Sequence, residues 1–199
     1  QYLGKRHSLR YFCQMAEVYK SGFVNIFGAP NAGKSTLLNL LLGERLVIVS
    51  PKVQTTRHRI LGILSEPNYQ IVFSDTPGII EPKYKLHQKM MMQVKSALED
   101  ADVAILVHDI NEPAVNLETI VASLKLKVPV ILLLNKLDAM KDKAMADKLV
   151  KQYRETYKGW KVLGISAKTA LNTDKIMPMV LEMLPEGMPF YPEDSISDR

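Results

Sequence analysis

One stretch constrains the fold more than any other: the octapeptide Gly-Ala-Pro-Asn-Ala-Gly-Lys-Ser at residues 28–35. It follows an apolar, strand-like run at 23–27 and leads into a helical run at 36–42. The pattern G-x-x-x-x-G-K-S between a strand and a helix is typical of a phosphate-binding loop. Its glycines let several backbone N–H groups point at one phosphate, and the helix N-terminus adds the positive end of its dipole. The sequence therefore predicts a site for a nucleoside triphosphate.

Two side chains of this loop have predicted roles beyond shaping the backbone. The ammonium group of Lys34 is expected to reach the β- and γ-phosphates, and the Ser35 hydroxyl is expected to ligate Mg²⁺. The alternative is a glycine-rich turn without a ligand, and the flanking strand and helix argue against it. The nucleotide-binding residues predicted from this loop are Gly28, Ala29, Pro30, Asn31, Ala32, Gly33, Lys34, Ser35 and Thr36.

The composition is typical of one globular α/β domain. The chain has 199 residues, of which 47% are hydrophobic and 24% charged, and no apolar run approaches the length of a membrane span. The single cysteine, Cys13, excludes an internal disulfide and indicates a reducing, cytoplasmic environment. Because the first residue is Gln1 rather than Met, we expect a fragment or a processed form. Whether the N-terminal extension at 1–19 is native stays open.

The net charge of +5 is the one compositional feature that suggests a nucleic-acid partner. Residues 1–22 alone carry a net charge of +3, so the rest of the chain carries only +2. No stripe of lysine and arginine stands out in that remainder. From the charge alone we therefore do not predict an RNA-binding surface.

Strand-like and helix-like segments alternate along the chain. This alternation predicts an α/β fold with a mostly parallel six-stranded sheet and helices on both faces. The turn-like residues 66–68 join two strands closely enough to predict an antiparallel hairpin at one edge, and Gly43 is expected to end the first helix. The remaining predicted strands are 60–64, 70–73, 103–108, 128–134 and 161–165, and the remaining predicted helices are 84–99, 114–126, 141–158 and 172–184.

A second cluster, Asp75-Thr76-Pro77-Gly78, directly follows the predicted strand at 70–73. Open α/β sheets bind their ligands at the carboxyl ends of the strands. We expect the Asp75 carboxylate to hold Mg²⁺ through water and the Gly78 N–H to contact the γ-phosphate. An ordinary turn is the alternative. The predicted nucleotide contacts of this segment are Asp75, Thr76, Pro77, Gly78 and Ile79.

The third cluster, Asn135-Lys136-Leu137-Asp138, follows the most apolar predicted strand. The Asp138 carboxylate can accept hydrogen bonds from N1–H and N2–H₂ of guanine, whereas adenine has no matching donor pair. Asn135 is expected to tie this loop to the phosphate loop, and the stem of Lys136 to lie along the base plane. A fourth cluster follows the last strand, and its backbone is expected to contact guanine O6; its residues are Ser166, Ala167 and Lys168.

These four clusters, in this order, resemble those of GTPases of the Ras-like, translation-factor-related superfamily, which have a P-loop GTPase fold. A narrower resemblance, to the Era family of bacterial GTPases, covers about residues 20–199. It rests on the loop at 28–35 and on the segments 20–26, 54–59 (Gln-Thr-Thr-Arg-His-Arg) and 191–199, of which 54–59 is the most specific.

The Era resemblance implies a monomeric GTPase domain at 20–186 that binds GTP or GDP with Mg²⁺ and has a peripheral association with the inner membrane face. It also implies binding of small-subunit ribosomal RNA through a C-terminal KH domain. A KH domain needs a G-x-x-G loop, and no two of the ten glycines are three positions apart. We therefore expect that the KH domain is missing and that 187–199 is a linker. Related GTPases of tRNA modification or large-subunit assembly are an alternative.

The predicted mechanism of hydrolysis depends on two positions. Ile79 stands where Ras-type enzymes carry a glutamine that orients the attacking water, and isoleucine cannot form that hydrogen bond. In similar GTPases the residue matching Asn31 helps to hold K⁺, so slow, K⁺-assisted hydrolysis is expected; a loop-shaping role for Asn31 and a scaffold with negligible turnover remain alternatives. Thr56, with Thr55 as its rival, is the expected switch residue. The predicted catalytic residues are Asn31, Lys34, Thr56 and Gly78, and the predicted Mg²⁺ ligands are Ser35, Thr56 and Asp75.

Overall fold

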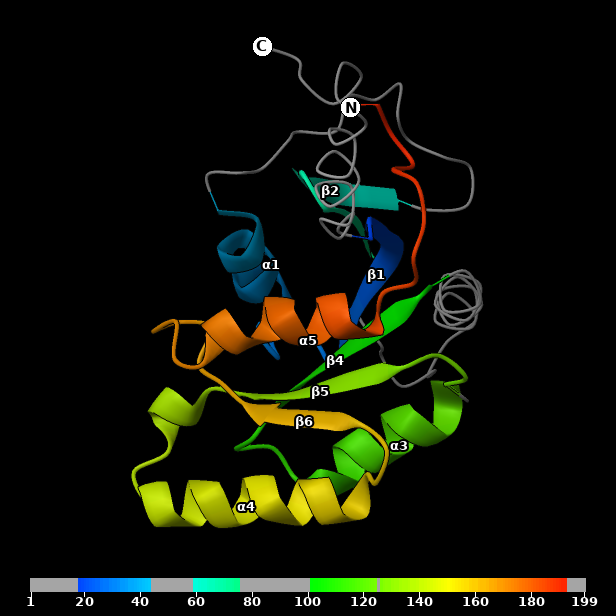
Figure 1. Ribbon diagram of the computed structural model, residues 1–199. Coiled ribbons are helices and arrows are strands. Elements are labelled where there is room, and N and C mark those ends of the chain that lie inside the picture. Colours follow the sequence, from blue (N-terminus) through cyan, green and yellow to red (C-terminus); the bar gives the residue numbers. More distant parts are fainter. Residues whose placement is uncertain (1–17, 44–58, 76–100, 125, 193–199) are drawn as a thin grey trace, which may run out of the picture.

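Six short apolar segments form one sheet at the centre of the molecule (Figure 1). The computed structural model describes residues 18–43, 59–75, 101–124 and 126–192. The strand order is β2-β3-β1-β4-β5-β6, and only the β2–β3 pair is antiparallel. The predicted fold class, including the antiparallel edge strand, is therefore confirmed. The strands are β1 (Lys20–Gly28), β2 (Arg59–Glu66), β3 (Tyr69–Asp75), β4 (Val103–Asp109), β5 (Val130–Asn135) and β6 (Lys161–Gly164).

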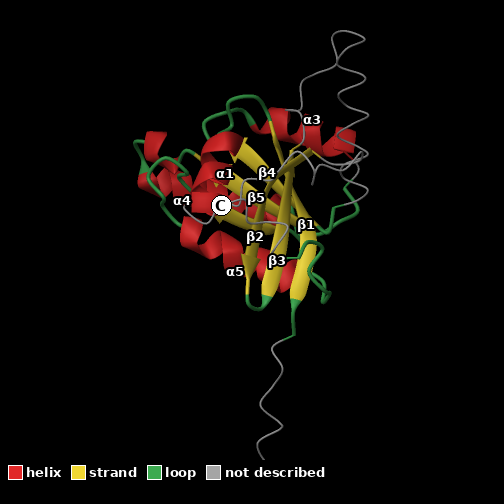
Figure 2. Ribbon diagram, turned by 90° about the horizontal axis from the view of Figure 1, so that it is seen from above, coloured by secondary structure: helices red, strands yellow, loops and turns green. Residues whose placement is uncertain are grey.

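The four described α-helices cover the two faces of this sheet (Figure 2). On one face, α1 (Lys34–Leu42) and α5 (Ile176–Met183) pack on a core that includes Ile105 and Ile131. On the other face, the core is completed by side chains of α3 (Ala114–Leu124) and α4 (Lys143–Thr156).

The neighbouring inner strands β4 and β5 are apolar on both faces. Every residue of Val103–Val107 and of Val130–Leu134 is buried. Such continuous apolar runs are typical of parallel strands that helices cover from both sides. Their register places Asp109 beside Asn135, and it also places Val107 beside Gly28 of β1. The carboxyl ends of the strands therefore meet along one edge.

The predicted element boundaries were close, with two informative differences. The helix predicted at 141–158 begins after Asp142, whose side chain accepts a hydrogen bond from the Met145 N–H at 3.1 Å and caps the helix. The helix predicted at 172–184 begins only after Asn172, which has a positive φ of 58°, and its first turn is a 3₁₀ turn (Thr173–Lys175) that precedes α5. Gly43 ends α1 as expected, with a φ of 49°. The helix predicted at 84–99 lies outside the described residues, and no described helix is long and apolar enough to cross a membrane.

The tail expected to be a linker packs against the sheet as far as it is described. The Gly187 N–H donates to the Tyr19 carbonyl at 3.0 Å, and the ring of Phe190 lies 4.8 Å from that of Phe23. The buried side chain of Gln70 holds both backbone groups of Tyr191, donating to its carbonyl at 2.9 Å and accepting from its N–H at 3.0 Å. The tail is thereby fastened to β3.

We expect Gln70→Ala to lower the free energy of unfolding by about 1–2 kcal/mol, because the variant loses both hydrogen bonds to Tyr191. Urea denaturation measures this change. Gln152→Ala, which truncates an exposed glutamine of α4, is the matched control and should change stability by less than about 0.5 kcal/mol. Equal effects of the two substitutions would show that the Gln70 contacts contribute nothing specific.

Candidate nucleotide-binding site

The predicted phosphate loop forms a tight turn between β1 and α1. Gly28 and Gly33 have φ angles of 151° and 99°, which favour glycine. A Cβ atom at Gly28 would lie 2.2 Å from the Val107 carbonyl oxygen, and one at Gly33 would lie 2.2 Å from Asn135 Nδ2. Both glycines are therefore required by backbone conformation and by close neighbours. Asn31, at the exposed tip of the loop, also has a positive φ, of 63°.

The first turn of α1 provides the donors that a phosphate needs. The N-cap residue Gly33 offers no side chain to the backbone N–H groups of this turn, and the turn contains no acidic residue. Lys34 folds back over the loop, and its Nζ donates to the carbonyl oxygens of Gly28 at 3.0 Å and Ala29 at 2.7 Å. Ser35 and Thr36 are exposed at the same end of the helix. The arrangement combines the N–H groups of a helix N-terminus, a cation and a hydroxyl, and so it fits a phosphate bound with Mg²⁺.

The buried Asn135 side chain joins three segments of the site. Its Nδ2 donates to the Ala32 carbonyl at 2.8 Å, and its Oδ1 accepts from the Ala167 N–H at 2.9 Å. The first of these bonds is the predicted tie to the phosphate loop. Because the Ala167 N–H is engaged in this way and the Ser166 N–H donates to the Leu171 carbonyl at 3.2 Å, the Lys168 N–H is the remaining backbone donor of the fourth cluster.

The exposed carboxylate of Asp138 is held by the fourth cluster. The fully buried Ser166 hydroxyl donates to Asp138 Oδ1 at 2.6 Å and accepts from the Thr169 N–H at 3.2 Å. A backbone hydrogen bond from Leu137 N to the Ile165 carbonyl holds the two loops together. The structure thus places Asp138 in a fixed orientation before any base is bound.

Asp109, at the end of β4, is a residue of this site that the sequence analysis did not select. Its Oδ2 lies 2.7 Å from the ammonium nitrogen of Lys136, and its Oδ1 accepts two hydrogen bonds from Asn111, at 3.0 and 2.9 Å. Burial acts to raise the pKa of Asp109, but the hydrogen bonds from Lys136 and Asn111 and the charge of Lys136 outweigh it and lower the pKa. Its position at a strand carboxyl end was the available signal.

A small cavity of about 160 Å³ lies between the phosphate loop and the end of β4. Pro30 and Asn31 line one side, and His108, Asp109 and Lys136 line another. Burial lowers the pKa of His108, although the charges of Asp109 and Glu112 oppose this shift. His108 is therefore a neutral wall of the cavity at physiological pH.

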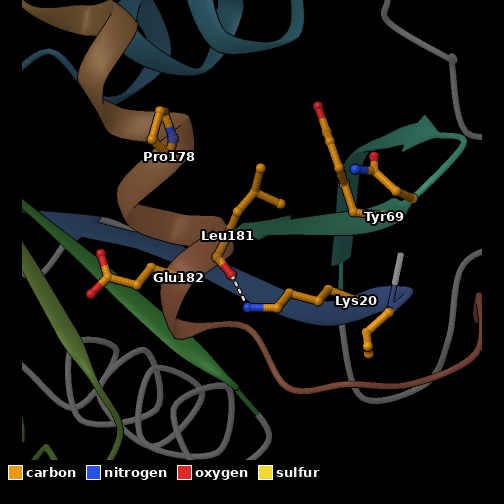
Figure 3. Close-up of a pocket in the computed structure, with 7 residues that line it drawn as sticks. Lys20, Tyr69, Pro178, Leu181 and Glu182 are labelled. Carbon is orange, nitrogen blue, oxygen red and sulfur yellow. Dashed lines mark hydrogen bonds between the residues drawn. The ribbon is translucent and has the colours of Figure 1, made fainter. Parts of the chain in front are cut away.

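A second cavity, of about 290 Å³, lies away from the predicted site residues (Figure 3). It is bounded by the start of β1, the β2–β3 turn and α5. The ammonium group of Lys20 points at the end of α5 and donates to the Leu181 carbonyl at 2.7 Å. Lys20 therefore caps the C-terminus of that helix, where a cation is favourable.

Part of the predicted site lies outside the described residues. The backbone of Asp75 ends β3 beside Ile26 of β1, close to the phosphate loop in register, and its side chain is not described. Within the described ranges, no group of three or more His, Cys, Asp or Glu side chains could hold a metal ion. The predicted residues outside the described ranges are Thr55, Thr56, Thr76, Pro77, Gly78 and Ile79.

Comparison with known proteins identifies the family. The 50S ribosome-binding GTPase family matches residues 23–136, which is more than half of the chain. The chain belongs to this family of GTPases. GTPase Era of Clostridium botulinum (strain Kyoto, type A2) is 44% identical over 184 residues, and GTPase Era of Clostridium acetobutylicum is 42% identical over 184 residues. Both alignments cover 92% of this chain, which spans only 62% of the length of these relatives.

Solved structures of GTPases give the same picture. A variant of Aquifex aeolicus Era bound to GDP and AlF₄⁻ superposes with a TM-score of 0.74 and 41% identity, over 90% of this chain and 62% of that chain. A structure of Era with MgGDPNP and nucleotides 1506–1542 of 16S ribosomal RNA has a TM-score of 0.74 and 40% identity, over 91% and 62% of the two chains. The G domain of the Thermotoga maritima FeoB iron transporter has a TM-score of 0.61 and 25% identity, and 98% of it is covered by 82% of this chain.

The ion pair between Asp109 and Lys136 predicts that substitutions of the two residues have non-additive effects on GDP affinity. Asp109→Asn keeps the shape of the side chain and removes its charge, so the Lys136 side chain loses its fixed position. We expect GDP affinity to fall about five-fold, or ~1 kcal/mol. In a Lys136→Met background the same substitution should change affinity by less than two-fold, as a double-mutant cycle would reveal.

Glu112→Gln is the control for this cycle, because it removes a carboxylate from the same cavity without touching the Lys136 ion pair. Its effect on GDP affinity should be less than two-fold. If Asp109→Asn weakens GDP binding equally with and without Lys136, Asp109 does not act through the lysine.

Proposed function

We propose that this chain is the nucleotide-binding domain of a GTPase switch that binds GTP and GDP with Mg²⁺, hydrolyses GTP and acts on the ribosome. The observation that carries the proposal is the convergence of the phosphate loop, Asn135 and the Ser166–Asp138 pair at the carboxyl edge of one sheet. Membership of a GTPase family and the nucleotides bound in the Era structures support it.

Asp138 selects guanine in this proposal. Ser166 holds one carboxylate oxygen, which orients the group toward the N1–H and N2–H₂ donors of the base. An adenine base would leave the carboxylate without these donors, and an unpaired, partly desolvated charge is unfavourable. The aliphatic stem of Lys136 lies along the base, while Asp109 holds its ammonium group.

Nucleotide binding requires Lys34 to change partners. Its ammonium group now donates to two carbonyl oxygens of its own loop, and the β- and γ-phosphates would replace them with charged acceptors, which form stronger hydrogen bonds. Ser35, Asp75 and Thr56 would hold Mg²⁺, which neutralises charge developing on the phosphates. The backbone N–H groups of the first turn of α1 would receive the phosphates.

Hydrolysis is proposed to depend on Asn31 and K⁺, because Ile79 cannot orient water by hydrogen bonding. Asn31 is exposed at the tip of the phosphate loop and lines the small cavity beside it. A cation held there would act beside the phosphates as an arginine finger does in other GTPases. Gly78 would contact the γ-phosphate through its N–H, and Thr56 would complete the metal site.

The ribosomal partner is proposed from the relatives. One Era structure contains part of 16S ribosomal RNA, which favours the small subunit, whereas the description of the matching family names the 50S subunit. Co-sedimentation of the protein with purified 30S and 50S subunits in the presence of GDPNP distinguishes these two candidates. Binding to 30S alone supports the small-subunit role, and binding to 50S alone would replace it with the large-subunit role.

The guanine assignment is tested by Asp138→Asn. An amide offers a donor to the 2-oxo group of xanthine and no longer accepts two hydrogen bonds from guanine. We expect GTP affinity to fall by at least about 100-fold and XTP to become the preferred nucleotide. Asp174→Asn, an exposed aspartate of the 3₁₀ turn, is the control and should leave both affinities unchanged. Unaltered GTP binding in Asp138→Asn would refute the assignment.

The proposed cation dependence is tested by comparing single-turnover GTP hydrolysis in K⁺ and in Na⁺ at equal ionic strength. We expect turnover to be at least about ten-fold faster in K⁺, and Asn31→Ala should abolish this difference while leaving GDP affinity within about three-fold. Equal rates in the two salts would exclude K⁺ assistance, and absence of hydrolysis in both would favour a nucleotide-sensing scaffold.

A further inference from the structure

The charge of the described residues is unevenly distributed. Residues 141–161, which comprise α4 and its flanks, contain seven lysine and arginine residues against three aspartate and glutamate residues, a net charge of +4. All other described residues together contain seven against ten, a net charge of −3. The positive charge of the described part of this GTPase is therefore concentrated at one helix, which Figure 1 shows at the end of the molecule opposite β2.

The helical period gathers most of these cations on one side of α4. With about 100° between successive residues, four cations of α4 fall within an arc of about 140°, next to the face that Val150 and Tyr153 bury against the sheet, and Lys158 lies in the turn that follows the helix. Only Asp147 and Glu155 interrupt this arc. We call the five residues the α4 basic flank; they are Lys143, Lys148, Lys151, Arg154 and Lys158.

The lysines of this flank take no part in ion pairs within the described part of the chain. Arg154 donates to the Val162 carbonyl at 3.2 Å and protects the edge of β6. Within the described part of the chain, the four lysines have no ion-pair partner, and all four are exposed. Three such ammonium groups on α4 and one in the turn after it are available to a polyanion.

Two aromatic rings lie beside the C-terminal end of the flank. Tyr157 and Trp160 stack with their centroids 4.9 Å apart and their planes at 15°. Tyr157 also stacks with Tyr153, at 6.3 Å, and the rings of Tyr157 and Trp160 both pack against the core while staying partly exposed. Flat aromatic surface next to lysines is the combination with which proteins bind single-stranded RNA, through base stacking and phosphate contacts.

We propose that the α4 basic flank binds the phosphate backbone of RNA, with a base stacking against the Tyr157–Trp160 pair. The proposal rests on the ribosomal partner proposed above and adds a contact made by the GTPase domain itself. An anionic membrane is the other polyanion to consider. A helix that lies on a membrane must turn apolar side chains outward, whereas α4 buries its apolar face in the core and exposes Met145 as its only large apolar side chain.

The proposal is tested with a fluorescein-labelled single-stranded RNA 20-mer of uridine, by anisotropy between 50 and 200 mM KCl. The variant Lys151→Gln/Lys158→Gln removes two phosphate contacts, so its plot of log K against log salt should be less steep by about 1.4. We expect its affinity at 50 mM KCl to fall at least about ten-fold. The control Lys127→Gln/Lys175→Gln removes the same charge from exposed positions outside α4. Its RNA affinity at 50 mM KCl should fall less than three-fold.

Intrinsic fluorescence provides a second readout, because Trp160 is the only tryptophan of the chain. The RNA should quench it, whereas inorganic polyphosphate, which has no bases, should bind without quenching. GDP binding by every variant reports that the fold and the proposed nucleotide site are intact, so failure of the RNA surface is distinguishable from failure of the proposed function.

Three results would overturn the proposal. The first is no RNA binding by the parent chain at 50 mM KCl. The second is an equal loss in the α4 variant and its control, which would indicate diffuse charge attraction. The third is binding to vesicles containing phosphatidylserine that depends on Lys151 and Lys158 while RNA binding does not, which would assign the flank to a membrane.

Discussion

The buried amide of Asn135 is the interaction on which the geometry of the site depends. This side chain donates a hydrogen bond to the Ala32 carbonyl in the phosphate loop and accepts one from the Ala167 N–H in the loop after β6. Since a buried amide that loses a partner costs about 1–3 kcal/mol, both loops are held at fixed distances from the end of β5. The two loops that we propose bind the phosphates and the base are therefore joined through one side chain.

The amide of Asn135 also connects two motifs that are distant in the sequence, the phosphate loop at 28–35 and the segment 135–138. A Cβ atom at Gly33 would lie 2.2 Å from Asn135 Nδ2, so the second glycine of the phosphate loop makes room for the asparagine of the later motif. The first glycine, Gly28, makes room for the Val107 carbonyl of β4. The loop sequence is thus constrained by its protein neighbours as well as by the phosphate that we propose it binds.

Sequence reasoning predicted the parts of the fold that local chemistry determines. Continuous apolar runs predicted β4 and β5. Three of the four polar clusters, at 28–35, 135–138 and 166–168, meet in the structure, because parallel strands bring their carboxyl ends together. Asp109 was missed because a single aspartate carries no motif; its significance arises from the β4–β5 register, which places it beside Asn135 and Lys136.

Two other features were missed because they belong to surfaces rather than to segments. The net charge summed along the sequence hid the α4 basic flank, because acidic residues lie between its lysines. Only the helical period shows that the cations of α4 lie on one side of the helix. The Pro- and Gly-containing tail has the composition of a linker, yet the buried Gln70 fixes its backbone at Tyr191. A hydrogen bond from a distant side chain to the backbone cannot be predicted from the composition of either segment.

The two ends of β3 connect the site to the tail. Asp75 ends the strand beside β1 and the phosphate loop, and Gln70, near its start, is hydrogen-bonded to Tyr191. A strand is stiff along its axis, because shifting it by one residue turns every side chain to the opposite face. A change in the position of Asp75 on nucleotide binding would therefore either stretch the ladder between β3 and β1 or move Gln70 and the tail with it.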